Sequence, residues 1–236
     1  MQLQTGSLIS TQALLFDMDG TLVDSTAVVE RTWGRFAQRH GLDLAQVLHA
    51  AHGRRTAETV AMFAPPGVDT DAETARIVAE EVADTDGIVE VPGARRFLQR
   101  LPANRWAVVT SASRELAIRR MQAAGVPIPP ILITAEDVAS GKPAPEGYLA
   151  AARALGVDPA HCLSFEDAPA GLQSAHAAGT RVIALATTLK AEDLRGEDWI
   201  ADFHALQALD PADDQRQVLH FSVQVDTRQA PRTTPA

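Results

Sequence analysis

The chain has 236 residues, which suits one domain of ordinary size or a core that carries a smaller insertion. Its hydrophobic content of 46% allows a sizeable buried core. Its formal net charge of -9 argues against nucleic-acid binding, which needs basic patches, but leaves room for a small anionic substrate in a local positive pocket.

The single cysteine and the uncharged segments bear on location. Cys162 has no partner for an internal disulfide bond, which agrees with a reducing compartment. The first cation is Arg31, so the N-terminus lacks the positive region of a secretory signal. The uncharged stretch 121–135 is too short and too broken by prolines to cross a membrane. We expect a cytoplasmic protein with no membrane partner.

Short apolar runs predict the strands of a sheet. In chain order they are 13–19, 106–112, 131–137, 161–167 and 181–187. Segments of helical composition lie before the second strand and between the later ones, at 92–101, 113–125, 145–156 and 168–179. Strands that are apolar on both faces and alternate with helices indicate a parallel sheet covered on both sides. We therefore expect an α/β fold with a Rossmann-like parallel-sheet core.

The long interval between the first two strands predicts an insertion. Residues 26–88 are rich in Ala, Val, Glu and Arg and have helical periodicity. We interpret them as a small inserted helical cap domain with limits of 24–89. Residues 1–23 and 90–210 then form the core.

The C-terminal part predicts less regular structure. Residues 199–206 have the composition of one more short strand. In 218–225 apolar residues alternate with less apolar ones, which is typical of a half-buried edge strand. We assign 211–236 to a C-terminal extension, and expect its polar end, 227–236, to be disordered.

Polar residues follow the predicted strands at their carboxyl ends, where open α/β sheets bind ligands. These candidates are Asp17, Asp19, Thr110, Ser111, Lys142, Glu166 and Asp167. Three carboxylates in one pocket repel one another and need a cation, and oxygen ligands of this kind suit Mg²⁺. Each group alone has a structural alternative, such as a surface turn, a helix cap or a solvated lysine. Their joint order along the chain favours a site.

Four motifs in order, DMDGTLVDS, VVTSAS, GKPAPEGY and FEDAPAG, resemble those of the haloacid dehalogenase superfamily of phosphotransferases. The helical insertion directly after the first motif is similar to that family's small cap. Within the superfamily, the chain looks like the sugar-phosphate and glycerol-phosphate phosphatases, which are related to β-phosphoglucomutase. The resemblance covers roughly residues 12–205.

The resemblance implies catalytic roles for the first aspartates. Asp17 would be the nucleophile that forms an aspartyl-phosphate, and Asp19 the general acid and base. Two positions along a strand share one face, so both side chains would reach one phosphate. Thr110, Ser111 and Lys142 would bind the phosphate and neutralise its charge.

The resemblance also implies a metal site and a substrate contact in the cap. Mg²⁺ would be bound by Asp17, the backbone carbonyl of Asp19, and Asp167, with Glu166 assisting. The cap segment HGRRTAET (52–59) contains Arg54, whose planar fork suits substrate hydroxyls or a second phosphate.

These features predict a monomeric Mg²⁺-dependent phosphatase that hydrolyses a small phosphorylated metabolite, a sugar or polyol phosphate. The alternative is a mutase of the β-phosphoglucomutase type. That enzyme has Val where this chain has Thr21 and a cap His where this chain has Val29, so hydrolysis is favoured. A phosphoaspartate receiver or a pseudoenzyme without turnover is a further alternative. A nucleophile on the first strand, followed by a cap, argues against a receiver.

Overall fold

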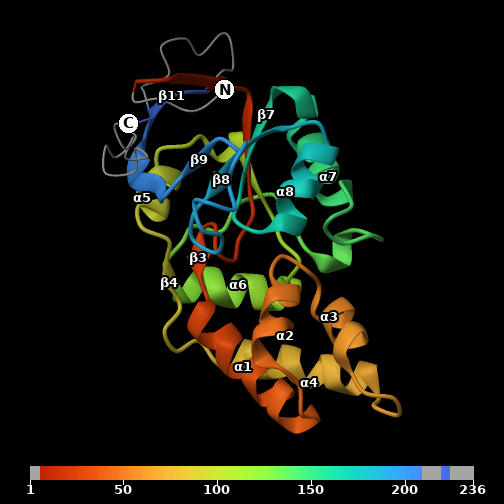
Figure 1. Ribbon diagram of the computed structural model, residues 1–236. Helices are drawn as coiled ribbons and strands as arrows, with labels where there is room; N and C mark the ends of the chain where they lie inside the picture. Colours follow the sequence, from red (N-terminus) through yellow and green to blue (C-terminus); the bar gives the residue numbers. More distant parts are fainter. Residues whose placement is uncertain (1–5, 209–218, 224–236) are drawn as a thin grey trace, which may run out of the picture.

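A computed structural model describes residues 6–208 and 219–223, and its centre is a parallel sheet (Figure 1). The strands are β2 (Ala13–Phe16), β5 (Trp106–Val109), β6 (Leu132–Ile133), β7 (Cys162–Glu166), β8 (Arg181–Leu185) and β9 (Trp199–Ile200). They lie in the order β6-β5-β2-β7-β8-β9, and every neighbouring pair is parallel. The predicted α/β core is therefore confirmed.

Helices cover both faces of the sheet, as the alternation along β2 shows. Leu14 and Phe16 pack on the side of α5 (Ala94–Leu98) and α6 (Arg114–Ala123). Ala13 and Leu15 pack on the side of α7 (Glu146–Leu155) and α8 (Pro169–Ala177). All four β2 residues are buried, as expected for a central parallel strand with two covered faces.

The strands end earlier than predicted, and this moves the first aspartates off the sheet. β2 ends at Phe16, and the chain then turns through Gly20, whose φ of 80° suits glycine. The Gly20 amide donates to the Val23 carbonyl at 2.7 Å and closes the turn. Asp17 and Asp19 therefore lie in a loop, and strand alternation does not place them on one face.

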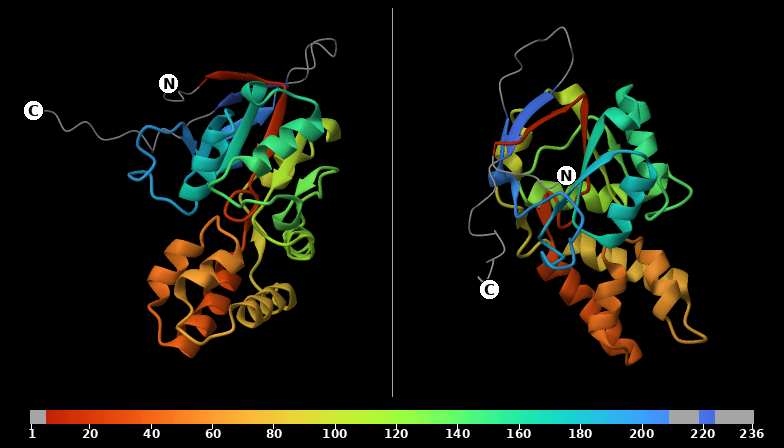
Figure 2. Two further views of the ribbon diagram at one scale, coloured as in Figure 1. Left: turned by 90° about the vertical axis from the view of Figure 1, so that its right-hand side faces the viewer. Right: turned by 45° about the horizontal axis from the view of Figure 1, so that its top comes forward.

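Four helices form the predicted insertion. They are α1 (Thr26–His40), α2 (Leu44–Ala51), α3 (Thr56–Phe63) and α4 (Thr70–Ala83). They enclose their own apolar core, made of Trp33, Phe36, Val47, Val60 and Ile77. An antiparallel ribbon of β3 (Val23–Asp24) and β4 (Val89–Glu90) joins them to the sheet domain. The helices gather at one end of the molecule as a cap (Figure 2). The limits of 24–89 stay a prediction.

A second, antiparallel sheet lies at the end of the molecule away from the cap (Figure 2). It contains β1 (Leu8–Thr11), β10 (Leu206–Ala208) and β11 (Leu219–Val223), in the order β1-β11-β10. The prediction of an edge strand in 218–225 is wrong, because β11 is the central strand and pairs on both sides. In the segment 199–206, Trp199–Ile200 form β9, a 3-10 helix follows at Phe203–Ala205, and Leu206 begins β10.

The disorder expected for 227–236 falls outside the described residues. Within the described part of the chain, none of the helices has the length and apolar character needed to cross a membrane.

Candidate active site between the sheet and the cap

A cleft separates the carboxyl ends of the strands from the cap. Asp17, Asp19, Thr110, Ser111 and Asp167 line its core wall. The cap wall includes Val29, Glu30, Trp33, His52, Arg54 and Thr56. The structure thus brings the predicted candidates together, Arg54 included. Lys142 and Glu166 do not line the cleft but lie buried directly behind Asp17.

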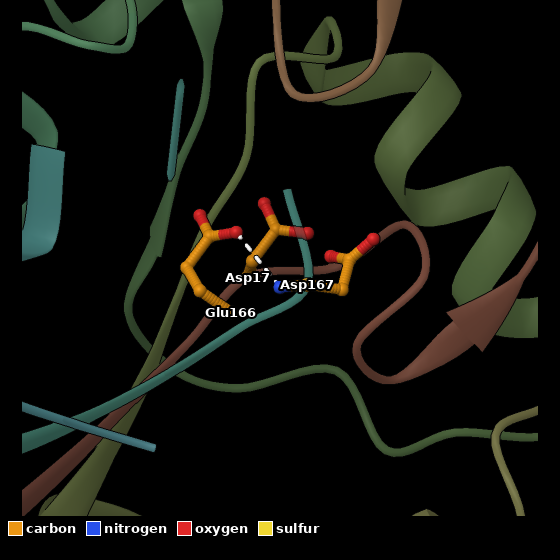
Figure 3. Close-up of side chains that lie close together, drawn as sticks. All are labelled: Asp17, Glu166 and Asp167. Atoms are coloured by element: carbon orange, nitrogen blue, oxygen red, sulfur yellow. Dashed lines mark hydrogen bonds between the residues drawn. The ribbon is translucent and has the colours of Figure 1, made fainter. Parts of the chain in front are cut away.

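Three carboxylates meet below the floor of the cleft, and two of them, Asp17 and Asp167, line it. Oxygen atoms of Asp17, Glu166 and Asp167 all lie within 4.8 Å of one another, and all three residues are buried (Figure 3). Burial raises the pKa of Asp17 well above its ordinary value, although Lys142 opposes the shift. Burial, and then the Glu166 carboxylate, raise the pKa of Asp167 to about 7. Such crowding of oxygen ligands fits a hard divalent cation, which would compensate the charge.

Lys142 is held by the same carboxylates. Its Nζ donates to Asp17, to Glu166 Oε1 at 2.6 Å and to the Val109 carbonyl at 3.2 Å. Burial alone would lower the pKa of Lys142, but the two carboxylates outweigh it and hold the pKa above its ordinary value. The ammonium group is therefore charged and fixed beside Asp17.

Glu166 is saturated with hydrogen bonds, which separates it from the other two acids. Its Oε1 accepts from Lys142 and from the Tyr148 hydroxyl at 2.8 Å. Its Oε2 accepts from the backbone amides of Asp167 at 3.1 Å and Ala168 at 3.4 Å. Four bonds use the acceptor capacity of a carboxylate. Glu166 therefore holds Lys142, while Asp17 and Asp167 line the cleft.

Asp167 is also oriented by two hydroxyl groups. The Thr21 hydroxyl donates to Asp167 Oδ1 at 3.0 Å, and the Thr188 hydroxyl donates to Oδ2. Thr188 follows β8, so its hydroxyl reaches the site from the carboxyl end of yet another strand. Each Asp167 oxygen accepts one of these bonds and retains a lone pair for a ligand.

Thr110 and Ser111 follow β5 but do not cap the next helix. Ser113 caps α6, because its side chain accepts from the Leu116 amide. Thr110 Oγ1 accepts from the Ala112 amide at 3.1 Å, which leaves its proton to donate into the cleft. The Ser111 hydroxyl donates to the Gly53 carbonyl at 2.8 Å and thereby joins the core to the cap.

Asp19 is held by residues that the sequence did not single out. Ser25 donates to Asp19 Oδ1 at 2.6 Å, and Arg120 Nη1 lies 2.9 Å from the same oxygen. Arg120 Nη2 lies 2.9 Å from Glu81 Oε1 on cap helix α4. The carboxylate of Asp19 therefore lies in a different network from that of Asp17.

Three site residues that the sequence analysis did not name have features in the sequence that could have predicted them. Thr188 follows the last long predicted strand, so the rule of strand ends applies to it as well. Tyr148 closes the motif GKPAPEGY that contains Lys142. Arg120 lies four residues after buried Leu116, on the apolar stripe of its helix, where a charged residue needs a partner.

Comparisons with known proteins agree with this geometry. The family of haloacid dehalogenase-like hydrolases matches residues 11–179. Hexitol phosphatase A of Escherichia coli is 43% identical over 178 residues, which cover 74% of this chain and 82% of that protein. Glycerol-1-phosphate phosphohydrolase 1 of Saccharomyces cerevisiae is 36% identical and covers 79% of each chain.

A solved structure shares the fold. A β-phosphoglucomutase from Clostridium difficile superimposes with a TM-score of 0.71 at 20% identity, over 81% of this chain and 91% of that one. The family match extends over more than half of the chain and contains the strand ends that carry the acidic cluster. The chain therefore belongs to the haloacid dehalogenase-like hydrolases.

Proposed function

We propose that this protein is a phosphomonoesterase that hydrolyses sugar or polyol phosphates through a phosphorylated Asp17. The observation that carries the proposal is the Asp17 carboxylate at the bottom of the cleft, beside the Lys142 ammonium and near Asp167. The names of the relatives, which refer to hexitol and glycerol phosphates, support the same class of substrate.

The reaction has two steps. An Asp17 oxygen attacks phosphorus, the bond from phosphorus to the substrate oxygen breaks, and Asp19 gives its proton to the departing alcohol. Asp19 then takes a proton from a water molecule that attacks the aspartyl-phosphate, and inorganic phosphate leaves. Lys142 offsets the charge on the transferred group, and the Thr110 hydroxyl donates to one of its oxygens.

A bound Mg²⁺ belongs to this proposal. Asp17, Asp167 and the Asp19 backbone carbonyl would hold it, with Glu166 behind them, and the ion would offset the repulsion between an anionic nucleophile and an anionic phosphate. The crowding of three buried carboxylates is the observation that supports the ion.

The cap wall supports a polyhydroxylated substrate and hydrolysis rather than phosphoryl transfer to a sugar. Glu30, His52 and Arg54 face the cleft and offer donors and acceptors to hydroxyl groups. Val29 lines the cleft where the related mutase carries a histidine, and an isopropyl group cannot exchange a proton. A monomeric state and a cytoplasmic location are part of the same proposal.

The test is a phosphate-release assay on purified protein with Mg²⁺. The panel contains hexitol phosphates, glycerol 1-phosphate and β-glucose 1-phosphate, and Asp17→Asn is the matched variant. We expect phosphate release from polyol esters in the wild type and a loss of at least about 10³-fold in the variant. Formation of glucose 6-phosphate with little free phosphate would instead establish a mutase. Turnover that survives in Asp17→Asn would rule out the nucleophile.

A further inference from the structure

Arg120 of α6 connects the cap to the proposed acid and base. We propose that Arg120 is a positioning residue for Asp19, and that Glu81 of the cap holds Arg120 in place. This inference rests on the proposed phosphatase function, because it concerns the proton that Asp19 gives to the leaving alcohol. Neither Arg120 nor Glu81 belongs to the four sequence motifs.

The first observation is the burial of Arg120. The residue is 4% exposed, although it carries a permanent charge. Its side chain is buried on α6, and α6 packs against cap helix α4, with both helices below the sheet in Figure 1. Burying an arginine is costly unless carboxylates pair with it. Asp19 and Glu81 supply that pairing, one to each terminal nitrogen, at 2.9 Å.

The second observation is the direction of the Asp19 carboxylate. Its Oδ1 receives both the Ser25 hydroxyl, at 2.6 Å, and Arg120 Nη1. Ser25 directly precedes cap helix α1, and Arg120 contacts Glu81 of cap helix α4, so each donor is tied to the cap. With one oxygen fixed by two donors, the other is left to exchange a proton with the substrate in the cleft.

The third observation is the place of Glu81. It is 4% exposed and extends from α4 to a residue of the core domain. A planar guanidinium held at one end by Glu81 cannot rotate freely, so its other end keeps a fixed direction towards Asp19. The position of the cap is thereby transmitted to the carboxylate that handles the proton.

Two phosphate esters with different leaving groups can distinguish the positioning of Asp19 as a proton donor from a purely structural role of Arg120. The alkoxide of glycerol 1-phosphate must receive a proton as it leaves. The nitrophenolate of p-nitrophenyl phosphate leaves as a stable anion and needs none. Loss of proton donation therefore slows the first ester and spares the second. Release of the alcohol is followed in the first turnover, before the aspartyl-phosphate is hydrolysed.

We expect Arg120→Met to slow glycerol release by about 10²-fold while nitrophenolate release stays within about threefold. Asp19→Asn should show the same pattern, and the double variant should be no slower than Asp19→Asn alone, because both changes remove one function. Glu81→Gln should slow glycerol release less than Arg120→Met does, and should again leave nitrophenolate release nearly unchanged. Arg119→Met is the matched control, since the neighbouring Arg119 is exposed and does not line the cleft, and both esters should react normally.

An equal loss for both esters, or additive effects in the double variant, would reduce Arg120 to structural support and overturn the proposal. Normal rates for both esters would overturn it as well. If Arg120→Met does not fold by circular dichroism, Arg120→Lys keeps the charge but not the fork and should show the same preference for the nitrophenyl ester. A wild type that releases phosphate from none of the sugar and polyol esters, nor from p-nitrophenyl phosphate, would instead overturn the proposed phosphatase.

Discussion

The Glu166 carboxylate leaves no room for a side chain at position 171. A Cβ added to Gly171 would lie 1.8 Å from Glu166 Oε1, far inside contact distance. Glycine is a poor helix former, yet it occupies the first turn of α8 at this point. The close approach to the carboxylate explains its presence, because α8 packs directly on the residue that holds Lys142.

We therefore predict that Gly171→Ala displaces Glu166 and Lys142 and lowers kcat by about 10²-fold, since a shift of about 1 Å at a reacting centre can cost that much. Gly34→Ala is the matched control in cap helix α1, where the nearest atom, Leu44 Cδ2, is 3.9 Å from the added Cβ. This change should leave kcat unaltered and stabilise the fold by up to about 1 kcal/mol. Steady-state kinetics and thermal unfolding measure both, and equal kcat in the two variants would contradict the steric explanation.

Residues of the site differ in how far the sequence could predict them. Asp17, Lys142 and Asp167 follow strands at their carboxyl ends, so chain order alone brings them to one edge of the sheet. Arg120 and Glu81 meet only because α6 packs on α4, and no local pattern encodes a contact between helices of different domains. The spacing of Arg120 from Leu116 marks it as a buried arginine that needs a partner, but nothing in the helix RELAIRR points to Glu81 as that partner.

At the scale of elements, whether a strand lies at the edge or in the centre of a sheet depends on its neighbours, and the sequence did not reveal the neighbours of β11. The alternation in 218–225 correctly predicted a strand, and β11 spans Leu219–Val223. Its central position depends on β1, a four-residue strand with the sequence LIST, and on the three residues of β10. Such short segments carry too little periodicity to be predicted.

The helices of the cap are joined by ion pairs, of which Arg31 with Asp84 is an example. Arg31 of α1 donates from Nε and Nη2 to the two oxygens of Asp84, at 3.0 and 2.9 Å, where α4 ends. The Arg31 hydrogen bonds, and then the Asp86 amide, hold the pKa of Asp84 below its ordinary value of 3.8. Because the folded pKa is depressed, the stabilisation is complete above the unfolded value and is lost as pH falls through the folded one.

We therefore predict that Asp84→Asn lowers the urea midpoint of unfolding at pH 7, and that the difference from the wild type narrows as the pH falls below about 4. The effect should be small, because the pair is partly exposed and screened by water. Arg31→Gln should give a similar loss, and the double variant little more than either. A difference that does not change with pH would show that the ion pair is not its cause.

At the scale of the whole molecule, polar contacts between described residues join the cap to the core around the cleft. Ser111 donates to the Gly53 carbonyl, Arg120 pairs with Glu81, and Arg55 donates to the Val138 carbonyl at 2.7 Å. Ser111 is itself a proposed phosphate ligand, Arg55 is the neighbour of Arg54, and Arg120 also contacts Asp19. The site is therefore shared between the two units, and its acidic half lies in the core.

The three buried carboxylates of the core repel one another, and a bound cation would offset this repulsion. We therefore predict that Mg²⁺ raises the stability of the fold. A ligand at about 100 times its Kd stabilises a fold by about 2.7 kcal/mol. For a chain of this size, that corresponds to a rise in Tm of about 5–10 °C. Differential scanning calorimetry with and without saturating Mg²⁺ measures the shift without any reference to activity.

Asp167→Asn should remove most of this rise, because it takes away one of the three clustered carboxylates that could hold the ion. Without metal, however, the variant should be at least as stable as the wild type, since burial and Glu166 disfavour the charge on Asp167 and raise its pKa to about 7. Asp43→Asn is the matched control: it changes the N-cap of α2, where Asn serves as well as Asp, and should leave the Mg²⁺ response intact. A full rise in Tm with Mg²⁺ in Asp167→Asn would exclude Asp167 as a metal ligand. A loss of stability in the metal-free variant would mean that the hydrogen bonds of Asp167 with Thr21 and Thr188 outweigh the cost of its buried charge.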